Sequence, residues 1–304
     1  MGDFQDISYG LHKEHFNDFS EERKKIMETW FRDDSADSWR TMRMYDSVKP
    51  LIEAFPSSKW LTVGDGRFGL DSIRLKKMGV QDVLPTDISP YLLEKAKQQG
   101  LISSFSIENA EKLSFGDGSF DFSFCKDSYH HFPRPYMALY EMLRVAKKAV
   151  ILTEPHDWFP RPYGKRLLVF SKNILKKLLG KKIHHNDQWN FEDSGNYVYS
   201  VSKREMEKTA LGLQLPAIGI SYFNDYYEKG LEFEKRDGTS VKYRKMKRKI
   251  LISDIKCKLG LASPTYITAI IFKENPEKKL RDALNAQGMQ VFDIPANPYL
   301  EKKN

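Results

Sequence analysis

The segment VGDGRFG at residues 63–69 constrains the fold of this chain more than any other feature. It follows the apolar run WLTV at 60–63, which is typical of a buried strand, and precedes the helix-like stretch LDSIRLKKM at 70–78. Glycines in such a turn remove side chains where the backbone passes close to a ligand, and the helix N-terminus faces that ligand. The order of strand, turn and helix predicts a nucleotide site. The three glycines are Gly64, Gly66 and Gly69.

An acidic residue in the next predicted strand strengthens that prediction. The run DVLPTD at 82–87 ends on Asp87, which lies 18 residues beyond Gly69. A carboxylate at this place can accept hydrogen bonds from both hydroxyls of a ribose, as in dinucleotide sites. The alternative is a glycine turn that only packs the strand against the helix. We favour nucleotide binding because the strand, the helix and the acid occur together.

The rest of the chain alternates between strand-like and helix-like segments. Helical spacing appears at 89–100 and 135–145, and a C-terminal helix at 279–288 precedes an irregular tail. Strands that alternate with helices of this length predict crossover units and a mostly parallel sheet, so the predicted fold class is α/β. The further strand-like runs are 103–108, 119–125, 148–154, 217–223 and 265–272.

The segment ENAEKLSFGDGSFDFSFCKDSYHHF at 108–132 decides between nucleotide-binding classes. The glycine turn alone would suit NAD, but NAD dehydrogenases have no reason to carry this segment at this spacing. Together with the glycine turn and Asp87, it resembles the class I S-adenosylmethionine-dependent methyltransferases, especially the methyltransferase type 11 family. The resemblance covers 60–154 well and 202–223 loosely. It implies a Rossmann-like fold with a mostly parallel seven-stranded sheet, helices on both faces, and S-adenosylmethionine as the cofactor.

The resemblance also implies roles for individual residues. The glycine loop would wrap the methionine part of the cofactor. The acid of the second strand would bind the ribose, with the next residue beside the adenine. A third segment would line the adenine edge, and backbone carbonyls after the fourth strand would complete the site. In that order, these residues are Gly64, Asp65, Gly66, Arg67 and Gly69; Asp87 and Ile88; Asn109, Ala110 and Glu111; and Cys125 and Lys126.

Three positions depart from the pattern of the family. Thr62 stands where the family usually has an acid, and Phe68 occupies the place of its third glycine. The sequence AKKA at 146–149 replaces the Lys-Pro-Gly-Gly turn before the fifth strand. The first two departures concern the binding of the methionine carboxylate, and the third is a loop change. None of them removes the predicted ribose and adenine contacts.

Two histidines are candidates for a catalytic base. Methyl transfer from a sulfonium mainly requires alignment and exclusion of water, but an oxygen nucleophile also benefits from a base. His131 follows the fourth strand and His156 the fifth, at the edge where open α/β sheets place ligands. Imidazole titrates near neutral pH, and we rank His131 first. Asp127 and Asp157 are alternatives, and His131 could equally fix its own loop by bonding to the backbone.

The net charge of +8 is concentrated in two inserts. Residues 155–186 carry eight lysines and arginines against one acid, and residues 228–258 carry eleven against five. Such inserts indicate an anionic partner, although a solvated basic face is the commoner explanation of a charge run. The amphipathic stretch 163–182 could cap an anionic substrate or lie on an anionic membrane surface. We favour a lid helix that packs on the sheet.

No metal site is expected from the sequence. His184, His185 and Asp187 form a polar cluster, but they complete no ligand-spacing motif. Cys125 and Cys257 are too few for a disulfide framework, and no run approaches the roughly 18 apolar residues of a membrane span. The first residues lack the pattern of a secretory signal. We therefore expect a cytoplasmic protein, with peripheral membrane contact left open by the inserts.

The predicted organisation has four parts. Residues 1–59 form an N-terminal helical lid, and residues 60–155 form the cofactor-binding half of the Rossmann-like domain. Residues 156–201 form an insert that serves as a substrate lid. Residues 202–304 form the remainder of the methyltransferase fold, with a basic insert at 225–263.

The leading functional hypothesis is a methyltransferase acting on a small molecule, with O-methylation of a sugar, a glycolipid precursor or a related metabolite as the preferred chemistry. One alternative is a nucleic-acid methyltransferase, but CKDSYHHF at 125–132 is not the Asn/Asp-Pro-Pro-aromatic motif of enzymes that methylate base amines. Another is a non-catalytic binding protein of the same fold, which only the departures at Thr62 and Phe68 support. The sequence predicts no oligomeric state. Phosphate contacts in the nucleic-acid alternative would come from Lys242, Tyr243, Arg244, Lys245, Lys247, Arg248 and Lys249.

Overall fold

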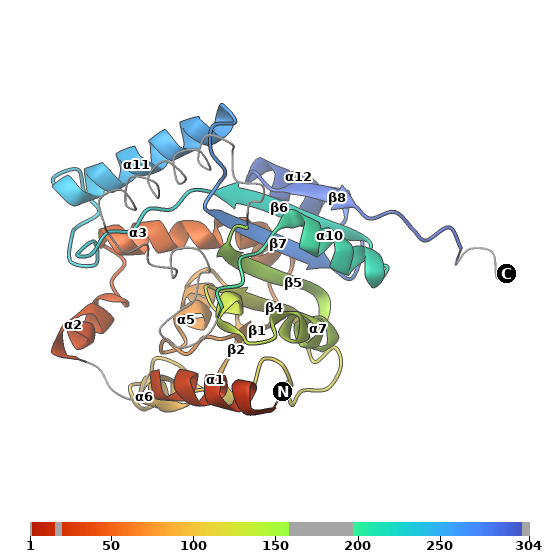
Figure 1. Cartoon of the computed structure of the whole chain (residues 1–304), viewed down its shortest axis with the longest axis horizontal. Coiled ribbons are helices and arrows are strands. Elements are labelled where there is room, and N and C mark those ends of the chain that lie inside the picture. The colour runs from red at the N-terminus through yellow and green to blue at the C-terminus, as the bar shows by residue number, and fades with distance from the viewer. Residues whose placement is uncertain (1, 16–19, 158–196, 300–304) are drawn as a thin grey trace, which may run out of the picture.

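The computed structural model describes residues 2–15, 20–157 and 197–299, and within them a single mixed sheet forms the centre of an α/β fold (Figure 1). The sheet has eight strands in the order β3-β2-β1-β4-β5-β7-β6-β8. The strands are β1 (Lys59–Val63), β2 (Asp82–Asp87), β3 (Ser106–Ile107), β4 (Phe120–Lys126), β5 (Ala146–Pro155), β6 (Ala217–Phe223), β7 (Tyr266–Phe272) and β8 (Gln290–Asp293).

Most of the sheet is parallel, as the alternation of strands and helices predicted. β1 to β5 pair in parallel, whereas β7 runs antiparallel to both β5 and β6, and β8 runs antiparallel to β6. The predicted count of seven strands is corrected to eight, because β8 forms where an irregular tail was expected. β8 is a four-residue edge strand with partly exposed side chains, so it carries little of the apolar pattern by which strands are recognised.

Helices cover both faces of the sheet, as predicted. On one face, Leu139 and Met206 belong to the same buried cluster as the strand residue Val150. On the other face, Leu51 and Leu284 pack with Trp60. The helices are α1 (Gly2–His15), α2 (Glu21–Thr29), α3 (Ala36–Met42), η1 (Arg43–Val48), α4 (Lys49–Ala54), α5 (Leu70–Lys77), α6 (Tyr91–Gln98), η2 (Tyr129–His131), α7 (Pro135–Val145), α10 (Lys203–Gly212), α11 (Val241–Lys258) and α12 (Lys278–Ala286).

The N-terminal region takes part in two kinds of packing. Met44, Val48 and Leu51, from η1 and α4, are fully or almost fully buried in the sheet core. The first helix, α1, instead reaches the carboxyl edge of the sheet, where the Ser89 hydroxyl donates to the Lys13 carbonyl at 3.4 Å. The four-part division of the chain, with boundaries near residues 59, 155 and 201, stays a prediction.

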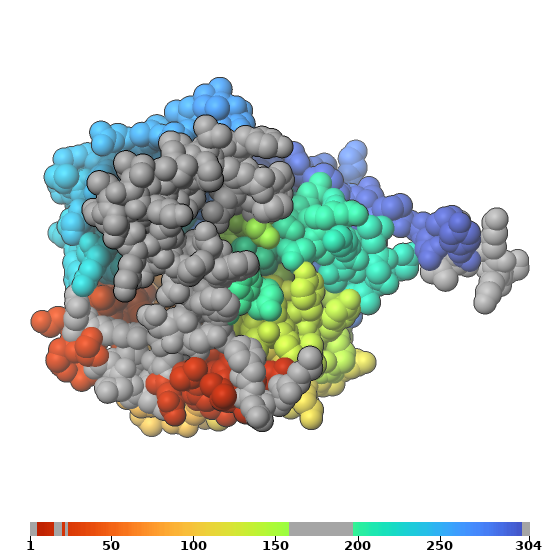
Figure 2. Space-filling model, viewed as in Figure 1, coloured from red at the N-terminus to blue at the C-terminus, as the bar shows by residue number. Residues whose placement is uncertain are grey.

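The basic stretch predicted to be helical at 163–182 and the cluster at 184–187 lie outside the described residues. Figure 2 shows the molecular surface in the same view as Figure 1. Among the described residues, no helix is both long enough and apolar enough to cross a membrane.

Candidate cofactor and acceptor site

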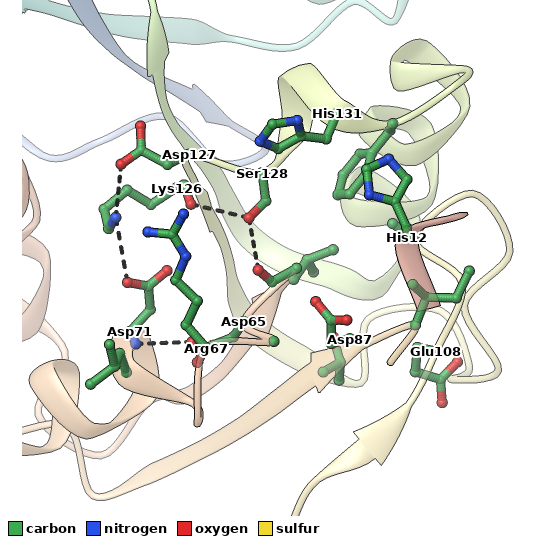
Figure 3. Close-up of a pocket in the computed structure, with 18 of the residues that line it drawn as sticks. His12, Asp65, Arg67, Asp71, Asp87, Glu108, Lys126, Asp127, Ser128 and His131 are labelled. Carbon is green, nitrogen blue, oxygen red and sulfur yellow. Dashed lines mark hydrogen bonds and ion pairs between the residues drawn. The ribbon is translucent and has the colours of Figure 1, made fainter. Parts of the chain in front are cut away.

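The loop after β1 lies at the carboxyl edge of the sheet and requires glycine at two points (Figure 3). Gly64 has φ +75°, and a Cβ added there would lie 2.5 Å from the Cβ of Ser128. A Cβ on Gly66 would lie 2.6 Å from the carboxyl group of Asp87. Both positions therefore exclude any larger residue, and the Ser128 hydroxyl fixes the loop by donating to the Gly64 carbonyl at 2.7 Å.

Asp87 leaves the sheet beside this loop. The parallel register sets Val63 opposite Thr86, so the loop and the end of β2 emerge at the same level. The Asp87 carboxylate accepts a hydrogen bond from the Ser89 amide at 2.8 Å, and the amides of Gly66 and Ile88 stabilise its charge as well. Burial outweighs these amides and raises the pKa of Asp87 to about 6. An ionised carboxylate held in this way still has capacity to accept from a ligand's hydroxyls.

Asp65 organises the start of α5 rather than presenting its carboxylate to the cavity. Its two oxygens accept from the amides of Asp71 and Ser72, at 3.0 and 2.9 Å, and from the Thr62 hydroxyl at 2.8 Å. Burial, followed by the nearby charge of Asp71, raises the pKa of Asp65. The family usually has an acid at the position of Thr62. Here the Thr62 hydroxyl instead donates a hydrogen bond to an acid three residues later, Asp65.

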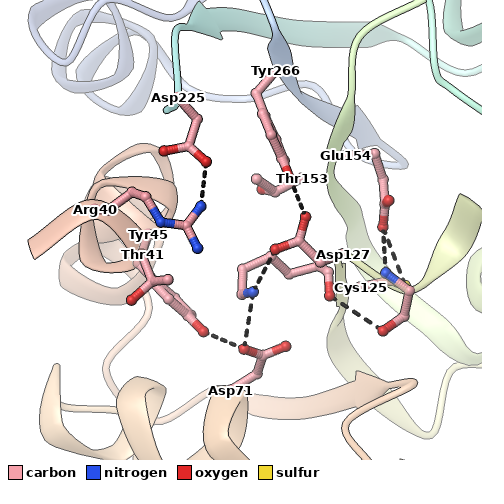
Figure 4. A network of polar contacts seen from close by, with 12 residues as sticks. Arg40, Thr41, Tyr45, Asp71, Cys125, Asp127, Thr153, Glu154, Asp225 and Tyr266 are labelled. Carbon is pink, nitrogen blue, oxygen red and sulfur yellow. Dashed lines mark hydrogen bonds and ion pairs between the residues drawn. The ribbon is translucent and has the colours of Figure 1, made fainter. Parts of the chain in front are cut away.

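A charged cluster forms the opposite end of the cavity (Figures 3 and 4). The ammonium of Lys126 is buried between two carboxylates, 3.1 Å from Asp127 and 3.7 Å from Asp71. Tyr45 donates to Asp71, and the Tyr266 hydroxyl donates to Asp127 at 2.8 Å. The pKa of Lys126 is raised because the two carboxylates outweigh the desolvation of the ammonium.

Asp127 has an unusual backbone conformation and an unusually low pKa. Its φ of +51° is rare for a residue other than glycine, and costs on the order of 1 kcal/mol that the surrounding contacts must offset. Burial alone would raise its pKa, but Lys126 and the Tyr266 hydroxyl bring the pKa of Asp127 down to about 2. The carboxylate is therefore ionised at every physiological pH and is a weak base.

Arg40 of α3 joins the charged cluster from the N-terminal region. Its guanidinium lies 3.0 Å from Asp37 and also contacts Asp225, which follows β6 (Figure 4). The second carboxylate oxygen of Asp225 is a buried side-chain atom without a hydrogen-bond partner within the described part of the chain. Burial raises the pKa of Asp225 despite the attraction of Arg40.

Helix α1 lies over the end of the cavity that contains Asp87, away from the charged cluster. The Tyr9 hydroxyl donates to the Glu111 carboxylate at 2.5 Å, across a separation of 102 residues. The same carboxylate accepts from both the backbone amide and the side chain of Arg134, at 2.8 and 2.5 Å. Glu111 was predicted to line the adenine edge, and it does line the cavity. Its carboxylate, however, binds α1 and Arg134.

The two predicted bases lie in different surroundings. His131 lines the cavity and packs edge-on against His12 of α1, with ring centroids 5.9 Å apart. His156 is not among the residues that line it. His156 forms a single bridge with Val201 just beyond β5. Its ring packs at a tilt against Tyr222, and Nδ1 lies 3.1 Å from the Pro264 carbonyl oxygen. Burial lowers the pKa of His156.

Glu154, at the end of β5, is a fully buried carboxylate that shapes the loop bearing His131. One oxygen accepts from the amides of Ser128 and Tyr129, at 3.1 and 3.0 Å. The other lies 2.5 Å from His130 Nδ1. Cys125 is fully buried below this loop with its sulfur 3.8 Å from Glu154, so its side chain faces the carboxylate and does not line the cavity.

The glycine loop, Asp87, the charged cluster and α1 surround a cavity of about 870 Å³, within the range of small-molecule and cofactor sites. Of the predicted cofactor residues, Cys125 and Gly69 do not line it; Gly69 instead precedes α5 with φ +66°. Prediction missed Tyr9, His12 and Arg40, which come from helices that carry no recognisable motif. It also missed Ser128, whose place directly after the fourth strand was the available signal. The predicted residues that do line the cavity are Gly64, Asp65, Gly66, Arg67, Asp87, Ile88, Asn109, Ala110, Glu111, Lys126 and His131.

No group of three or more His, Cys, Asp or Glu side chains suited to hold a metal ion occurs in residues 2–15, 20–157 and 197–299.

Comparison with known proteins identifies the core of this site. Residues 61–153 match the family model described as a methyltransferase domain. The 2-methyl-6-phytyl-1,4-hydroquinone methyltransferase of Synechocystis sp. is 32% identical over 138 residues, which are 44% of this chain and 41% of that protein. The chain thus spans about two fifths of the length of this curated relative.

Two solved structures of a methyltransferase are similar to this chain at low sequence identity. Magnesium protoporphyrin IX methyltransferase from Synechocystis PCC 6803, with bound SAH, is 16% identical, with a TM-score of 0.48. That alignment covers 86% of this chain and 98% of the other. The same enzyme with bound SAM is 14% identical, also with a TM-score of 0.48, covering 87% of this chain and 96% of the other.

The comparisons confirm the predicted resemblance to a methyltransferase domain over residues 61–153. The predicted Rossmann-like α/β class is confirmed as well, with eight strands in place of seven. The roles of individual cofactor and base residues stay predictions.

Proposed function

Because residues 61–153 form a methyltransferase domain, we propose that the chain transfers a methyl group from S-adenosylmethionine to a small molecule. One observation carries the proposal: the half-buried Asp87 carboxylate accepts from the amide of Gly66 in the glycine loop, and both residues line a cavity that His131 also lines. Asp87 would accept the two ribose hydroxyls, and Asn109 and Ala110 would flank the adenine. The bound cofactor would supply a methyl group already activated on a sulfonium.

The charged end of the cavity suits the amino-acid part of the cofactor. Arg40 offers a cation for the carboxylate, and Asp37 offers an anion for the ammonium, beside the backbone of the glycine loop. Asp65 would contribute indirectly, because its hydrogen bonds to Thr62 and to α5 hold that loop.

His131 is the proposed base. It lines the cavity on the loop that Glu154 shapes, whereas His156 is not among the residues that line the cavity. His131 would accept the proton of an oxygen nucleophile, such as the hydroxyl of a sugar, a glycolipid precursor or a related metabolite. A phenolic or quinol acceptor is a second candidate, favoured by the relative that is named for a hydroquinone.

The cofactor proposal is tested by thermal unfolding with candidate ligands. S-adenosylmethionine and S-adenosylhomocysteine should raise the Tm, whereas NAD and NADP should not. A ligand that binds only the native state stabilises it by about 2.7 kcal/mol at a hundredfold excess over its Kd. Stabilisation by NAD without stabilisation by S-adenosylmethionine would overturn the proposal.

The base is tested by turnover once an acceptor has been found by mass spectrometry of methylated products from a metabolite panel. His131→Ala should slow turnover by roughly 10²–10⁴ while the Kd for the cofactor stays nearly unchanged. His156→Ala is the matched control and should retain most activity. Normal turnover in His131→Ala would mean that alignment alone drives the reaction and that His131 is not the base.

A further inference from the structure

Helix α11 carries apolar side chains on two opposite faces. On the inner face, Tyr243, Met246 and Ile250 are buried against Ala36 and Leu231. This packing ties α11 to α3, and Trp39 of α3 meets Tyr243 edge-on with ring centroids 5.6 Å apart. Figure 1 shows α11 at the outer edge of the molecule, next to α3.

The C-terminal part of the outer face carries apolar side chains, where a helix covering a domain is normally polar. By helical periodicity, residues 251, 252, 255 and 259 fall on the side away from the inner-face residues. Together with Leu261 they form the α11 patch, in which each side chain is between 41% and 67% exposed. Contiguous exposed apolar side chains of this size mark an interaction site more often than scattered ones do. The α11 patch consists of Leu251, Ile252, Ile255, Leu259 and Leu261.

Basic side chains surround the α11 patch. Residues 241–261 contain eight lysines and arginines and one acid, Asp254. Arg248 and Lys249 lie just before the patch, and Lys256 and Lys258 lie among its members, all four exposed. A helix that combines exposed leucine and isoleucine with flanking lysine has the composition of a segment that lies in the plane of an anionic membrane surface.

We propose that the α11 patch docks on the surface of a bilayer that contains anionic phospholipid. The five apolar side chains would enter the headgroup region, and the surrounding lysines and arginines would contact lipid phosphates. The helix keeps its inner face on α3, so docking requires no unfolding. Arg40 of the same α3 lines the cavity, which places the proposed membrane contact one helix away from the site.

Other partners fit this surface less well. A nucleic acid would meet the lysines but offers no apolar partner for Leu251, Ile255 and Leu259. Tyr243, which the sequence suggested as part of a phosphate-contacting stripe, is buried and cannot stack on a base. A second copy of the chain would bring two strongly basic helices together, which like-charge repulsion opposes.

The test is co-sedimentation of the full chain with vesicles of phosphatidylcholine, with and without phosphatidylglycerol. We expect binding to the anionic vesicles, released by rising sodium chloride. Lys249→Glu/Lys256→Glu should weaken binding at least tenfold, on the basis of about fivefold for each basic charge lost near such a surface. Leu259→Asp should weaken it by about tenfold through the loss of one inserted side chain.

Two control variants test whether the loss of binding is specific to the α11 patch or follows from any change of charge or hydrophobicity on the protein. Lys278→Glu/Lys279→Glu makes the same charge change on α12, and Leu213→Asp changes an exposed leucine after α10. Both should bind vesicles like the unchanged protein. Equal loss in control and α11 variants, or equal binding to neutral and anionic vesicles, would overturn the proposal. Two further results would overturn it if the protein did not bind vesicles. One is a dimer that Leu259→Asp dissociates into monomers, and the other is binding of duplex RNA that Leu259→Asp does not weaken. The readout is independent of cofactor binding and turnover.

Discussion

The two ends of the cavity are built in different ways. The ribose end, named for the ribose that we propose Asp87 binds, is made by Gly66, Asp87 and Ile88. It depends on one glycine loop and the end of the neighbouring strand. The charged end, made by Arg40, Asp71, Lys126 and Asp127, draws its residues from α3, α5 and β4 and relies on Tyr266 of β7. At the first end a carboxylate is stabilised by backbone amides, and at the second by other side chains. Binding should therefore be most sensitive at the first end, and folding stability at the second.

The largest effect on binding is expected from Asp87→Ala. Two hydrogen bonds from ribose hydroxyls to an ionised carboxylate would be lost, at about 1.5–3 kcal/mol each, so the affinity for S-adenosylmethionine should fall by about 10²–10⁴. Isothermal titration calorimetry measures the Kd directly. Glu94→Ala, on the exposed side of α6, is the control and should bind normally. A Kd within threefold of that control would remove Asp87 from the site.

The charged end should respond in stability. In Lys126→Met, Asp71 and Asp127 would face each other without the ammonium between them, and the free energy of unfolding should fall by about 3–5 kcal/mol. Urea denaturation measures this loss, and Lys112→Met at an exposed position should stay within about 0.5 kcal/mol of the parent. Asp127→Asn added to Lys126→Met should restore part of the loss. No recovery in the double variant would mean that the ion pair is not what Lys126 stabilises.

Lowering the pH should change cofactor affinity and the stability contribution of Asp87 in opposite directions. The pKa of Asp87 is raised by burial to about 6, so cofactor affinity should fall by about tenfold between pH 7 and pH 5 as the carboxylate is protonated. The free energy of unfolding contributed by this group moves the other way. The folded state holds the proton more tightly than the unfolded state, so the contribution grows as pH falls through 6 and is complete below the unfolded pKa of about 4. Asp87→Asn should abolish both trends. The contribution of Asp87 is the difference in unfolding free energy between the parent and Asp87→Asn, and a difference that stays constant between pH 7 and pH 4 would contradict this assignment.

The smallest effect is expected where α1 meets the cavity. Tyr9→Phe removes one hydrogen bond to Glu111 and should weaken cofactor binding by about 3–10-fold. Tyr299→Phe, at a largely exposed position, should leave the Kd unchanged. Stronger binding in Tyr9→Phe would show that the contact between α1 and Glu111 opposes the ligand.

The same contrast explains what could be predicted from sequence. The ribose end is encoded within a segment of about 25 residues, whose glycines and acid have few other physical explanations. The charged end depends on pairs such as Arg40 with Asp225, which are 185 residues apart. Isolated charges in helices are normally solvated, and only the folded sheet brings these together. For the same reason, the fold class was predictable from the alternation of strands and helices, whereas the edge strand β8 was not.

Some residues that a motif predicted correctly as cavity-lining have side chains that bind the protein itself and not the cavity. Asp65 and Glu111 were assigned to the cofactor, and both line the cavity, yet their carboxylates are occupied by α5 and by α1 with Arg134. Sequence position identifies the segment that passes the ligand, but the hydrogen-bond partners of a side chain depend on elements far away in the chain. His156 illustrates the same point, because it follows β5 as predicted and yet does not line the cavity.

The contact between Tyr9 and Glu111 has a consequence for the timing of the reaction cycle. A cofactor in the ribose end would lie behind α1, so its entry and departure would require this contact and that of Arg134 to open. Substrate could then find a complete site only after the cofactor had entered, which makes an ordered sequence of arrivals the natural one. The spent cofactor would leave last, at a rate set by the opening of α1. In that case the slowest step of each cycle would be the exchange of spent for fresh cofactor, limited by the opening of a helix of 14 residues rather than by methyl transfer.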